Sequence, residues 1–450
     1  MSRFVLLMLL TSLLTTLQPR MSPDGLTILS QALADDDDDD DRDDDDDDDD
    51  EDDDDDRPAR AEPRQAAPAP LPQRAPDEII VRGLSQADLA QLLSEGFEQI
   101  DRRDLAQGGS LQRLRKPARL SLEDARDVVR ARATAARADF NHYYRTEEAA
   151  VPVADSCPGG LCLARQVIGW QAPSGCGDLP RIGMVDTGVN AGHETFAGAR
   201  LQLHSLDPAT TSAAPSDALH GTAVAALLVG APGSRSPGLV PGAELVAVDA
   251  FVRAGEDQRS DALTLIAALD WLGAQDLRLI NLSLAGPPND ELARQIEALA
   301  LQDILVVAAA GNLGPRAAPA YPAAYDSVLA VTAVDRRKQV YRRAGRGAHI
   351  DLSAPGVEVW TAASIRGART KTGTSYAAPF ATAAAALWLQ AEPGLSSADL
   401  MARITGSADD LGAPGRDPIF GAGLLTAPPA CPTAPAQDLP AAVPGGSARN

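Results

Sequence analysis

Short apolar runs alternate with longer segments of small and apolar residues from about residue 150 onward. Apolar runs of five to seven residues are typical of buried strands, and the longer segments are typical of helices. The predicted strands are 181–185, 244–250, 277–283, 304–309 and 328–333, and the predicted helices are 220–229, 261–272, 290–301, 375–391 and 397–406. Such alternation predicts an α/β fold in which a parallel sheet carries helices on both faces.

A different pattern occupies residues 78–145. A strand over 78–82 precedes a helix that Ser85 can cap, and two strands around 97–105 and 110–116 meet at a Gly-Gly turn. Ser121-Leu-Glu-Asp124 resembles a capping box that opens a second helix, which we expect to run to about residue 139. The β-α-β-β-α order predicts a small ferredoxin-like α+β unit.

The first residues are typical of an export signal. Arg3 precedes an apolar run over 4–17, which is short for a membrane span, and Ala32-Leu-Ala34 fits a signal peptidase site. We therefore expect residues 1–34 to be a signal peptide and the protein to be exported, to a periplasm or to the extracellular space. A retained membrane anchor is the alternative.

The acidic charge of the chain is local. The formal net charge is −23, and residues 35–56 contribute −20 of it through 20 Asp, one Glu and one Arg. The remainder is close to neutral, which disfavours nucleic acid as a partner. The Asp run, 35–56, is predicted to be disordered and is followed by a Pro/Ala-rich linker, 57–77.

The chain has four cysteines, at Cys157, Cys162, Cys176 and Cys431. They are more typical of disulfides in an oxidising compartment than of a zinc site, because no further Cys or His cluster accompanies them. Four cysteines allow three pairings, which the sequence leaves open. The last of them begins a Pro/Ala/Gly-rich tail, 431–450, that we expect to be flexible.

Three segments carry residue types that could form a reaction centre. Asp186 ends an apolar run in Met-Val-Asp-Thr-Gly, His220 opens a small-residue helix, and Ser375 lies in Gly-Thr-Ser-Tyr-Ala. A serine hydroxyl needs a base to become a nucleophile, and the base needs a third group to orient it. Each residue alone fits a turn or a helix cap, but the three together, in this order, predict a catalytic triad.

These segments resemble the subtilisin family of serine proteases, in which the triad follows the same Asp, His, Ser order. The resemblance implies a subtilisin-like catalytic domain over 151–430 and a propeptide over 78–150, with residues 139–145 as its C-terminal strand. In that family the propeptide assists folding and then blocks the cleft, so the chain's own propeptide would be an intramolecular inhibitor of a self-processing zymogen. A permanent regulatory domain is the alternative.

The resemblance also assigns further site residues. The side chain of Asn312 and the backbone N–H of Ser375 match the family's oxyanion hole. The substrate-binding residues would be Ser283, Leu284, Ala285 and Gly286 on one wall, with Ala310, Gly311 and Ala320 around the first specificity pocket. Ala285 and Ala320 stand where the family commonly has glycine, which predicts a shallow pocket that prefers medium apolar side chains.

The family's tight calcium site is not expected, because Glu194 and Thr195 follow His193 where the family often has an Asp ligand. We expect no required cofactor, and only weak calcium binding by the Asp run. The sequence thus predicts a monomeric serine endopeptidase that acts on polypeptides, with no membrane contact once the signal is removed. One alternative is a catalytically silent binding protein with an acidic arm. The other is an ester hydrolase with the same triad.

Overall fold

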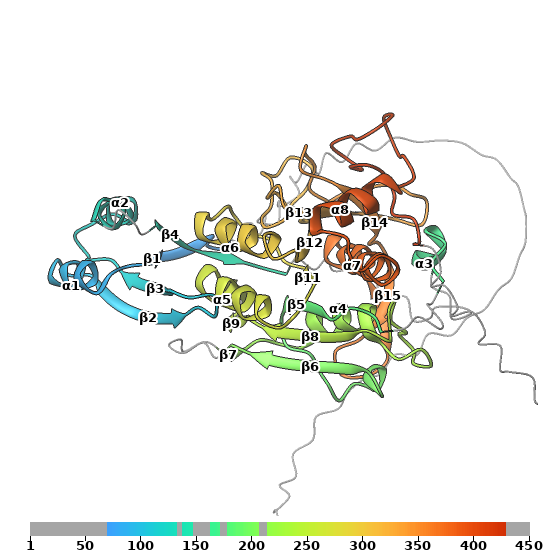
Figure 1. Cartoon of the computed structure of the whole chain (residues 1–450), viewed down its shortest axis with the longest axis horizontal. Coiled ribbons are helices and arrows are strands. Elements are labelled where there is room, and N and C mark those ends of the chain that lie inside the picture. The colour runs from blue at the N-terminus through green and yellow to red at the C-terminus, as the bar shows by residue number, and fades with distance from the viewer. Residues whose placement is uncertain (1–69, 133–136, 147–162, 172–177, 207–213, 429–450) are drawn as a thin grey trace, which may run out of the picture. The chain divides into compact units, whose positions relative to one another are not determined.

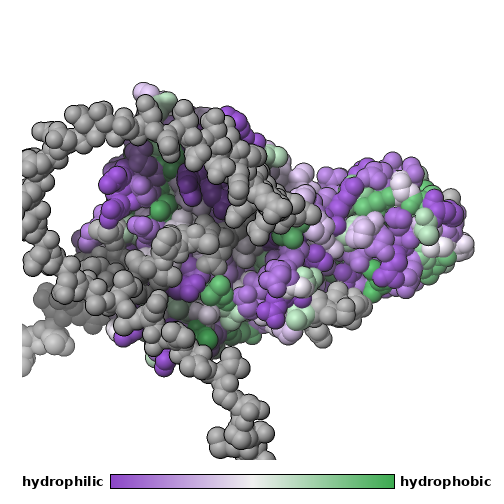
Figure 2. All heavy atoms as spheres, turned by 180° about the vertical axis from the view of Figure 1, so that it is seen from behind, coloured by the Kyte–Doolittle hydropathy of each residue, from purple (hydrophilic) through white to green (hydrophobic). Residues whose placement is uncertain are grey.

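The computed structural model describes residues 70–132, 137–146, 163–171, 178–206 and 214–428 (Figure 1). The predicted signal peptide, the Asp run, the four cysteines and the tail lie outside these residues. Within them, no helix is long and apolar enough to cross a bilayer. On the face shown in Figure 2, hydrophilic residues cover much of the described surface, and hydrophobic ones form small separate spots.

The larger part of the described chain is built on a parallel sheet with the order β14-β13-β12-β11-β5-β8-β6. Its strands are β5 (Ile182–Asp186), β6 (Arg200–Ser205), β8 (Glu244–Asp249), β11 (Leu279–Leu282), β12 (Leu305–Ala309), β13 (Val328–Val334) and β14 (Leu352–Pro355). All five predicted strands are present, within a few residues of their predicted bounds.

Helices cover both faces of this sheet (Figure 1). The helices are α4 (Leu219–Val229) and α7 (Thr374–Ala391) against one face, α5 (Ala262–Gly273) and α6 (Asp290–Ala300) against the other, and α3 (Leu163–Val167) and α8 (Ser397–Gly406) nearby. Alternate residues of β5 belong to separate cores, since Met184 packs with α4 and α7 whereas Val185 packs with α5 and α6. The predicted α/β class is therefore confirmed.

The N-terminal unit has the element order β-α-β-β-α-β and an antiparallel sheet ordered β2-β3-β1-β4. Its elements are β1 (Arg74–Arg82), α1 (Gln86–Ser94), β2 (Glu98–Asp104), β3 (Ser110–Arg115), α2 (Leu122–Arg132) and β4 (Arg137–Tyr144). The expected extension of the second helix to residue 139 is wrong. Ala138 instead pairs with Val81 of β1 and packs in the core of this unit, so the chain is already an extended strand there.

The sheet of the N-terminal unit continues into the larger part of the chain. β4 pairs with β10 (Asp257–Asp261), which pairs with β9 (Val252–Ala254), which in turn pairs with β7 (Ala214–Pro215). The remaining described elements are the hairpin β15 (Val359–Ala362) and β16 (Ala368–Lys371) and the 3₁₀ turn η2 (Glu194–Phe196). β4 is therefore the strand that joins the sheet of the N-terminal unit to strands β10, β9 and β7, whereas the parallel sheet stays separate.

Candidate active site

The carboxylate and the imidazole of the predicted triad are in direct contact. Asp186 is the last residue of β5, at the carboxyl edge of the sheet, and its side chain is fully buried. Its Oδ1 lies 2.7 Å from Nδ1 of His220, the second residue of α4, and also accepts the backbone N–H of Thr187 at 2.7 Å. This contact fixes the tautomer in which Nδ1 carries the proton and Nε2 can accept one.

A glycine allows this close approach. A Cβ at Gly221 would lie 2.3 Å from the carbonyl oxygen of Thr187 and 2.6 Å from that of Gly188. The first turn of α4 thus lies against the turn that follows Asp186, and the N–H of Gly221 donates to Oγ1 of Thr187 at 2.9 Å. Any larger residue would push His220 away from its carboxylate.

Ser375 lies at the start of the buried helix α7, where the N-terminal end of the helix dipole favours negative charge. Its Oγ donates to the carbonyl oxygen of Ser283 at 3.2 Å, whereas Nε2 of His220 is buried with no hydrogen-bond partner among the described residues. The ring centroid of His220 lies 5.5 Å from that of Tyr376, the residue that follows Ser375, so the imidazole is beside the first turn of α7. The two side chains thus lie near each other without a hydrogen bond between them, and catalytic hydrogen bonds of this kind often form only once substrate is bound.

The side chain of Asn312 is held in one orientation. Its Oδ1 accepts the N–H of Thr374 at 3.0 Å and the hydroxyl of Thr374 at 3.1 Å, and the N–H of Gly311 donates to that hydroxyl at 3.1 Å. With Oδ1 fixed in this way, the amide NH₂ is the group turned away from Thr374. Sequence reasoning found Asn312 but missed Thr374, although its place between Gly373 and Ser375 was visible.

The predicted substrate-binding residues fall in two adjoining groups. Residues 283–286, here called the 283–286 segment, follow β11, and Gly286 exchanges two backbone hydrogen bonds of 2.9 Å with Tyr321. This pairing brings Ala320, the residue before Tyr321, beside the segment. Ala310 and Gly311 precede Asn312 at the end of β12. The carbonyl contact of Ser283 with Ser375 joins the first group to the candidate nucleophile.

A second carboxylate lies beside Asp186 and was missed in the sequence. Asp249 ends β8 and is in register with Asp186. It accepts the hydroxyl of Ser216 at 2.8 Å, and burial raises the pKa of its carboxyl, with a smaller contribution from the nearby Asp186. An Asp at the end of an apolar run, the same signal that identified Asp186, could have identified it.

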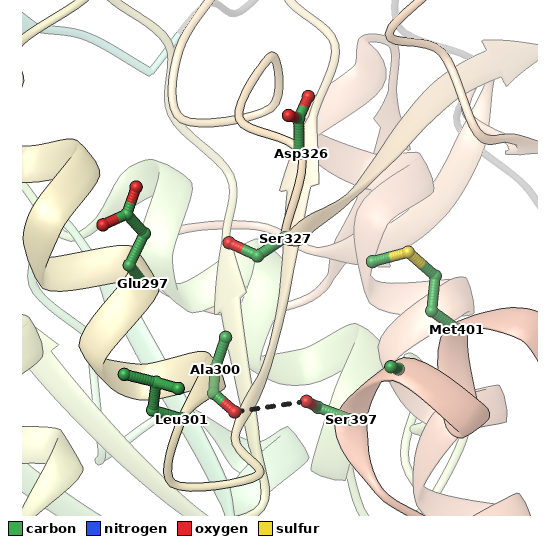
Figure 3. A pocket seen from close by; sticks show the side chains of 8 residues that line it. Glu297, Ala300, Leu301, Asp326, Ser327, Ser397 and Met401 are labelled. Atoms are coloured by element: carbon green, nitrogen blue, oxygen red, sulfur yellow. Dashed lines mark hydrogen bonds between the residues drawn. The ribbon is translucent and has the colours of Figure 1, made fainter.

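A cavity of about 510 Å³ lies elsewhere in the fold, between α6 and α8 (Figure 3). It is lined by Glu297, Ala300, Leu301, Asp326, Ser327, Ser397, Ala398 and Met401. Asp326 and Ser327 lie just before β13 and thus at the amino edge of the sheet, whereas Asp186 lies at the carboxyl edge. The cavity includes none of the predicted site residues. Across the described ranges, no three potential metal-ligating side chains form a group.

Comparison with known proteins places these observations in a family. A sequence model of the Subtilase family matches residues 177–423. Subtilisin DY from Bacillus licheniformis is 32% identical over 240 residues, which cover 52% of this chain and 84% of that protein. The minor extracellular protease Epr from Bacillus subtilis (strain 168) is 32% identical over 248 residues, which cover 54% of this chain but 37% of Epr.

Solved structures show the same fold. Fervidolysin from Fervidobacterium pennivorans, described as a keratinolytic enzyme related to subtilisin, has a TM-score of 0.64 at 18% identity, covering 79% of this chain and 60% of that one. The protease domain of PatA has a TM-score of 0.50 at 27% identity, covering 56% of this chain and 94% of that one. Since the family match spans more than half of its residues, the chain belongs to the subtilase family and is a serine protease of the subtilisin type.

Proposed function

We propose that the protein is an exported serine endopeptidase, made as a precursor whose N-terminal unit blocks the cleft until the protein cuts itself. The observation that carries the catalytic part is the 2.7 Å contact between Asp186 and His220. Within the part of the chain that the structure describes, the buried Nε2 of His220 has no hydrogen-bond partner, and the ring lies beside the turn that carries Ser375. A base that is oriented on one side and open on the other is what a serine nucleophile requires.

The proposed reaction assigns a role to each group. Oγ of Ser375 attacks the peptide carbonyl carbon while Nε2 of His220 takes its proton, and the imidazolium then protonates the leaving amine. Asp186 keeps the ring oriented and stabilises its positive charge. Negative charge on the carbonyl oxygen is stabilised by the amide of Asn312, the N–H of Ser375 and the N-terminal end of α7. Water then releases the acyl group by the same steps.

The N-terminal unit occupies the position expected of a bound peptide. Arg145, which follows β4, exchanges two backbone hydrogen bonds of 2.9 Å with Ala285, and β4 pairs on its other edge with β10. A Cβ at Gly286 would lie 2.4 Å from the ring of Tyr144, so the strand fills the space beside the segment. An extended chain that adds itself to an existing strand is a common mode of peptide binding.

The direction of this pairing leads toward the nucleophile. Because Arg145 and Ala285 pair antiparallel, residues after Arg145 run toward Ser283, whose carbonyl contacts Ser375. Continuing the register by two positions brings Glu147, which lies outside the described residues, opposite Ser283. We therefore place the self-processing cut within residues 143–153, at the bond after Glu147.

Polar contacts attach the N-terminal unit to α6. Asp139 of β4 accepts the N–H of Asp290 at the start of α6, at 2.8 Å. Arg82 of β1 donates to the fully buried Glu291 at 2.9 Å. Removing one partner of such a pair leaves the other charge uncompensated, so this contact favours one docking geometry of the N-terminal unit.

One contact of this interface predicts a dependence on pH. Nδ1 of His142 lies 3.1 Å from the donor Nδ2 of Asn289, so this nitrogen must accept. Burial lowers the pKa of His142; the charged groups that face it are Asp139, Arg74, Asp290 and Arg126. A lowered pKa means that the folded state favours the neutral ring, so its stabilising effect is complete above about pH 6.5 and is lost as the pH falls.

The measurement compares two full-length proteins that cannot process themselves, Ser375→Ala alone and Ser375→Ala with His142→Gln. We expect acidification from pH 7.5 to 5.5 to lower the melting temperature of the first protein more than that of the second. Gln can accept from Asn289 without titrating. Equal losses in the two proteins would show that His142 does not set the pH dependence.

The proposed function is tested with the purified mature protein. A serine-directed fluorophosphonate should label Ser375 stoichiometrically, and the protein should digest unfolded polypeptides as well as small esters. A folded protein with an unreactive Ser375 would instead be a silent binding protein. Turnover of esters without cleavage of any polypeptide would identify a different acyl hydrolase.

A further inference from the structure

The side chains at the end of β4 occupy defined positions between β10 and the 283–286 segment. Tyr144 is fully buried, and its hydroxyl donates to the carbonyl oxygen of Pro287 at 3.1 Å. Tyr143 lies under the guanidinium of Arg259, 3.8 Å from the ring centroid. Since Tyr144 pairs with Ser260 and Arg145 pairs with Ala285, the backbone is held on both edges. The residues that contact each side chain are therefore those a bound substrate would meet in the same register.

Arg145 is held by a single carboxylate of the larger part of the chain. Nε and Nη2 of Arg145 donate to Oδ1 and Oδ2 of Asp257 at 2.7 and 2.8 Å, a bidentate pair. The Arg145 and Asp257 side chains keep only 15% and 8% of their exposure. Water is therefore largely excluded from the pair, which makes its geometry more selective than that of a surface ion pair.

Asp257 is held ready for a cation by its own neighbour. Arg259, two residues further along β10, donates to Oδ2 of Asp257 at 2.8 Å. Burial opposes the charge of Asp257, but hydrogen bonds from Arg145 and Arg259 hold the pKa of its carboxyl below its usual value. The carboxylate thus stays ionised at neutral pH. Among the described residues, Oδ1 accepts a hydrogen bond from Arg145, whereas Oδ2 accepts from both Arg145 and Arg259.

We propose that Asp257 is a specificity-determining residue that selects substrates with arginine at the position Arg145 occupies, the third residue before the cleaved bond. This inference rests on the proposed function, because it requires that substrates bind as β4 does. Arginine is favoured over lysine, since the two oxygens match a planar fork of donors. Glutamate at this position is disfavoured, because it would bring two carboxylates together.

The test uses the mature protease and quenched fluorescent peptides with the sequence of residues 142–150, in which only the Arg145 position is varied. We expect kcat/KM to be about tenfold or more higher for Arg than for Gln, intermediate for Lys and lowest for Glu. Raising the salt concentration should narrow the gap between Arg and Glu. In Asp257→Asn the ratio of Arg to Gln should fall toward one, whereas the matched carboxylate variant Asp326→Asn, at the opposite edge of the sheet, should keep it.

Fluorophosphonate titration of active sites separates the ways in which this could fail. Equal kcat/KM for Arg and Gln in a parent protein that labels fully would overturn the selection and leave the proposed function intact. An unchanged ratio of kcat/KM for Arg over Gln in Asp257→Asn would show that another residue selects arginine. A parent protein that neither labels nor cuts any peptide would overturn the proposed function itself. If Asp257→Asn fails to mature, the parent's peptide series and its salt dependence still decide the selection.

Discussion

Replacing Ser375 by Ala is expected to abolish peptide hydrolysis and to leave the N-terminal unit attached. Removing the nucleophile of subtilisin itself lowers kcat about 10⁶-fold, and the same loss is expected here because His220 would have no hydroxyl to activate. Mass spectrometry of the purified protein should show residues 78–147 still attached in Ser375→Ala and missing from the parent. The matched control is Ser397→Ala at the start of α8, which should mature normally.

The position of the cut sharpens this prediction. The parent should begin at residue 148, as the antiparallel register of Arg145 with Ala285 requires. Glu147 would then lie in a pocket for which Ala285 and Ala320 predict medium apolar side chains. An intramolecular cut tolerates such a mismatch, because strand pairing already holds the bond beside Ser375. Cleavage of isolated Ser375→Ala at the same bond would show that Ser375 does not make this cut.

The fold was predictable wherever a strand is a nearly continuous apolar run of five or more residues. The central strands are nearly continuous apolar runs, and each predicted one is present in the sheet. β6 was missed because Arg200–Ser205 alternates polar and apolar residues at the exposed edge of the sheet. β14 was missed because its four residues end in a proline. Both strands depend on pairing with a neighbour more than on their own composition.

The residues of the candidate site also include some that the sequence reveals and some that it does not. Asp186, His220 and Asn312 lie in short motifs at element ends, so their types and spacing were visible in the sequence. The partners of Arg145 were not, because Asp257 is 112 residues away and joins it only through the pairing of β4 with β10. The contact of Arg82 with Glu291 spans 209 residues and was invisible for the same reason. Motifs thus predict the catalytic residues, whereas the three-dimensional pairing of strands determines which side chains contact β4.

Replacing Asn312 by Ala is expected to lower kcat about 10²–10³-fold with little change in KM, the effect known for the corresponding oxyanion donor of subtilisin. The amide acts on charge that develops in the transition state, so its loss should leave ground-state binding largely intact. Because Oδ1 is held by the N–H and hydroxyl of Thr374, the orientation of the amide also depends on that residue. Thr374→Val should therefore lower kcat in the same direction by a smaller factor, and Thr374→Ser should restore it.

The measurement is steady-state hydrolysis of one peptide. The concentration of folded protein is taken from its melting transition and not from fluorophosphonate labelling, because the labelling reaction itself uses the oxyanion hole. Gln302→Ala removes an exposed amide that bonds only within its own helix end, to the carbonyl oxygen of Ala298 at 3.0 Å, and should leave both constants unchanged. A rise in KM with kcat preserved in Asn312→Ala would assign this side chain to substrate binding. The oxyanion would then depend on the N–H of Ser375 and the dipole of α7, and the Thr374 variants would follow KM instead of kcat.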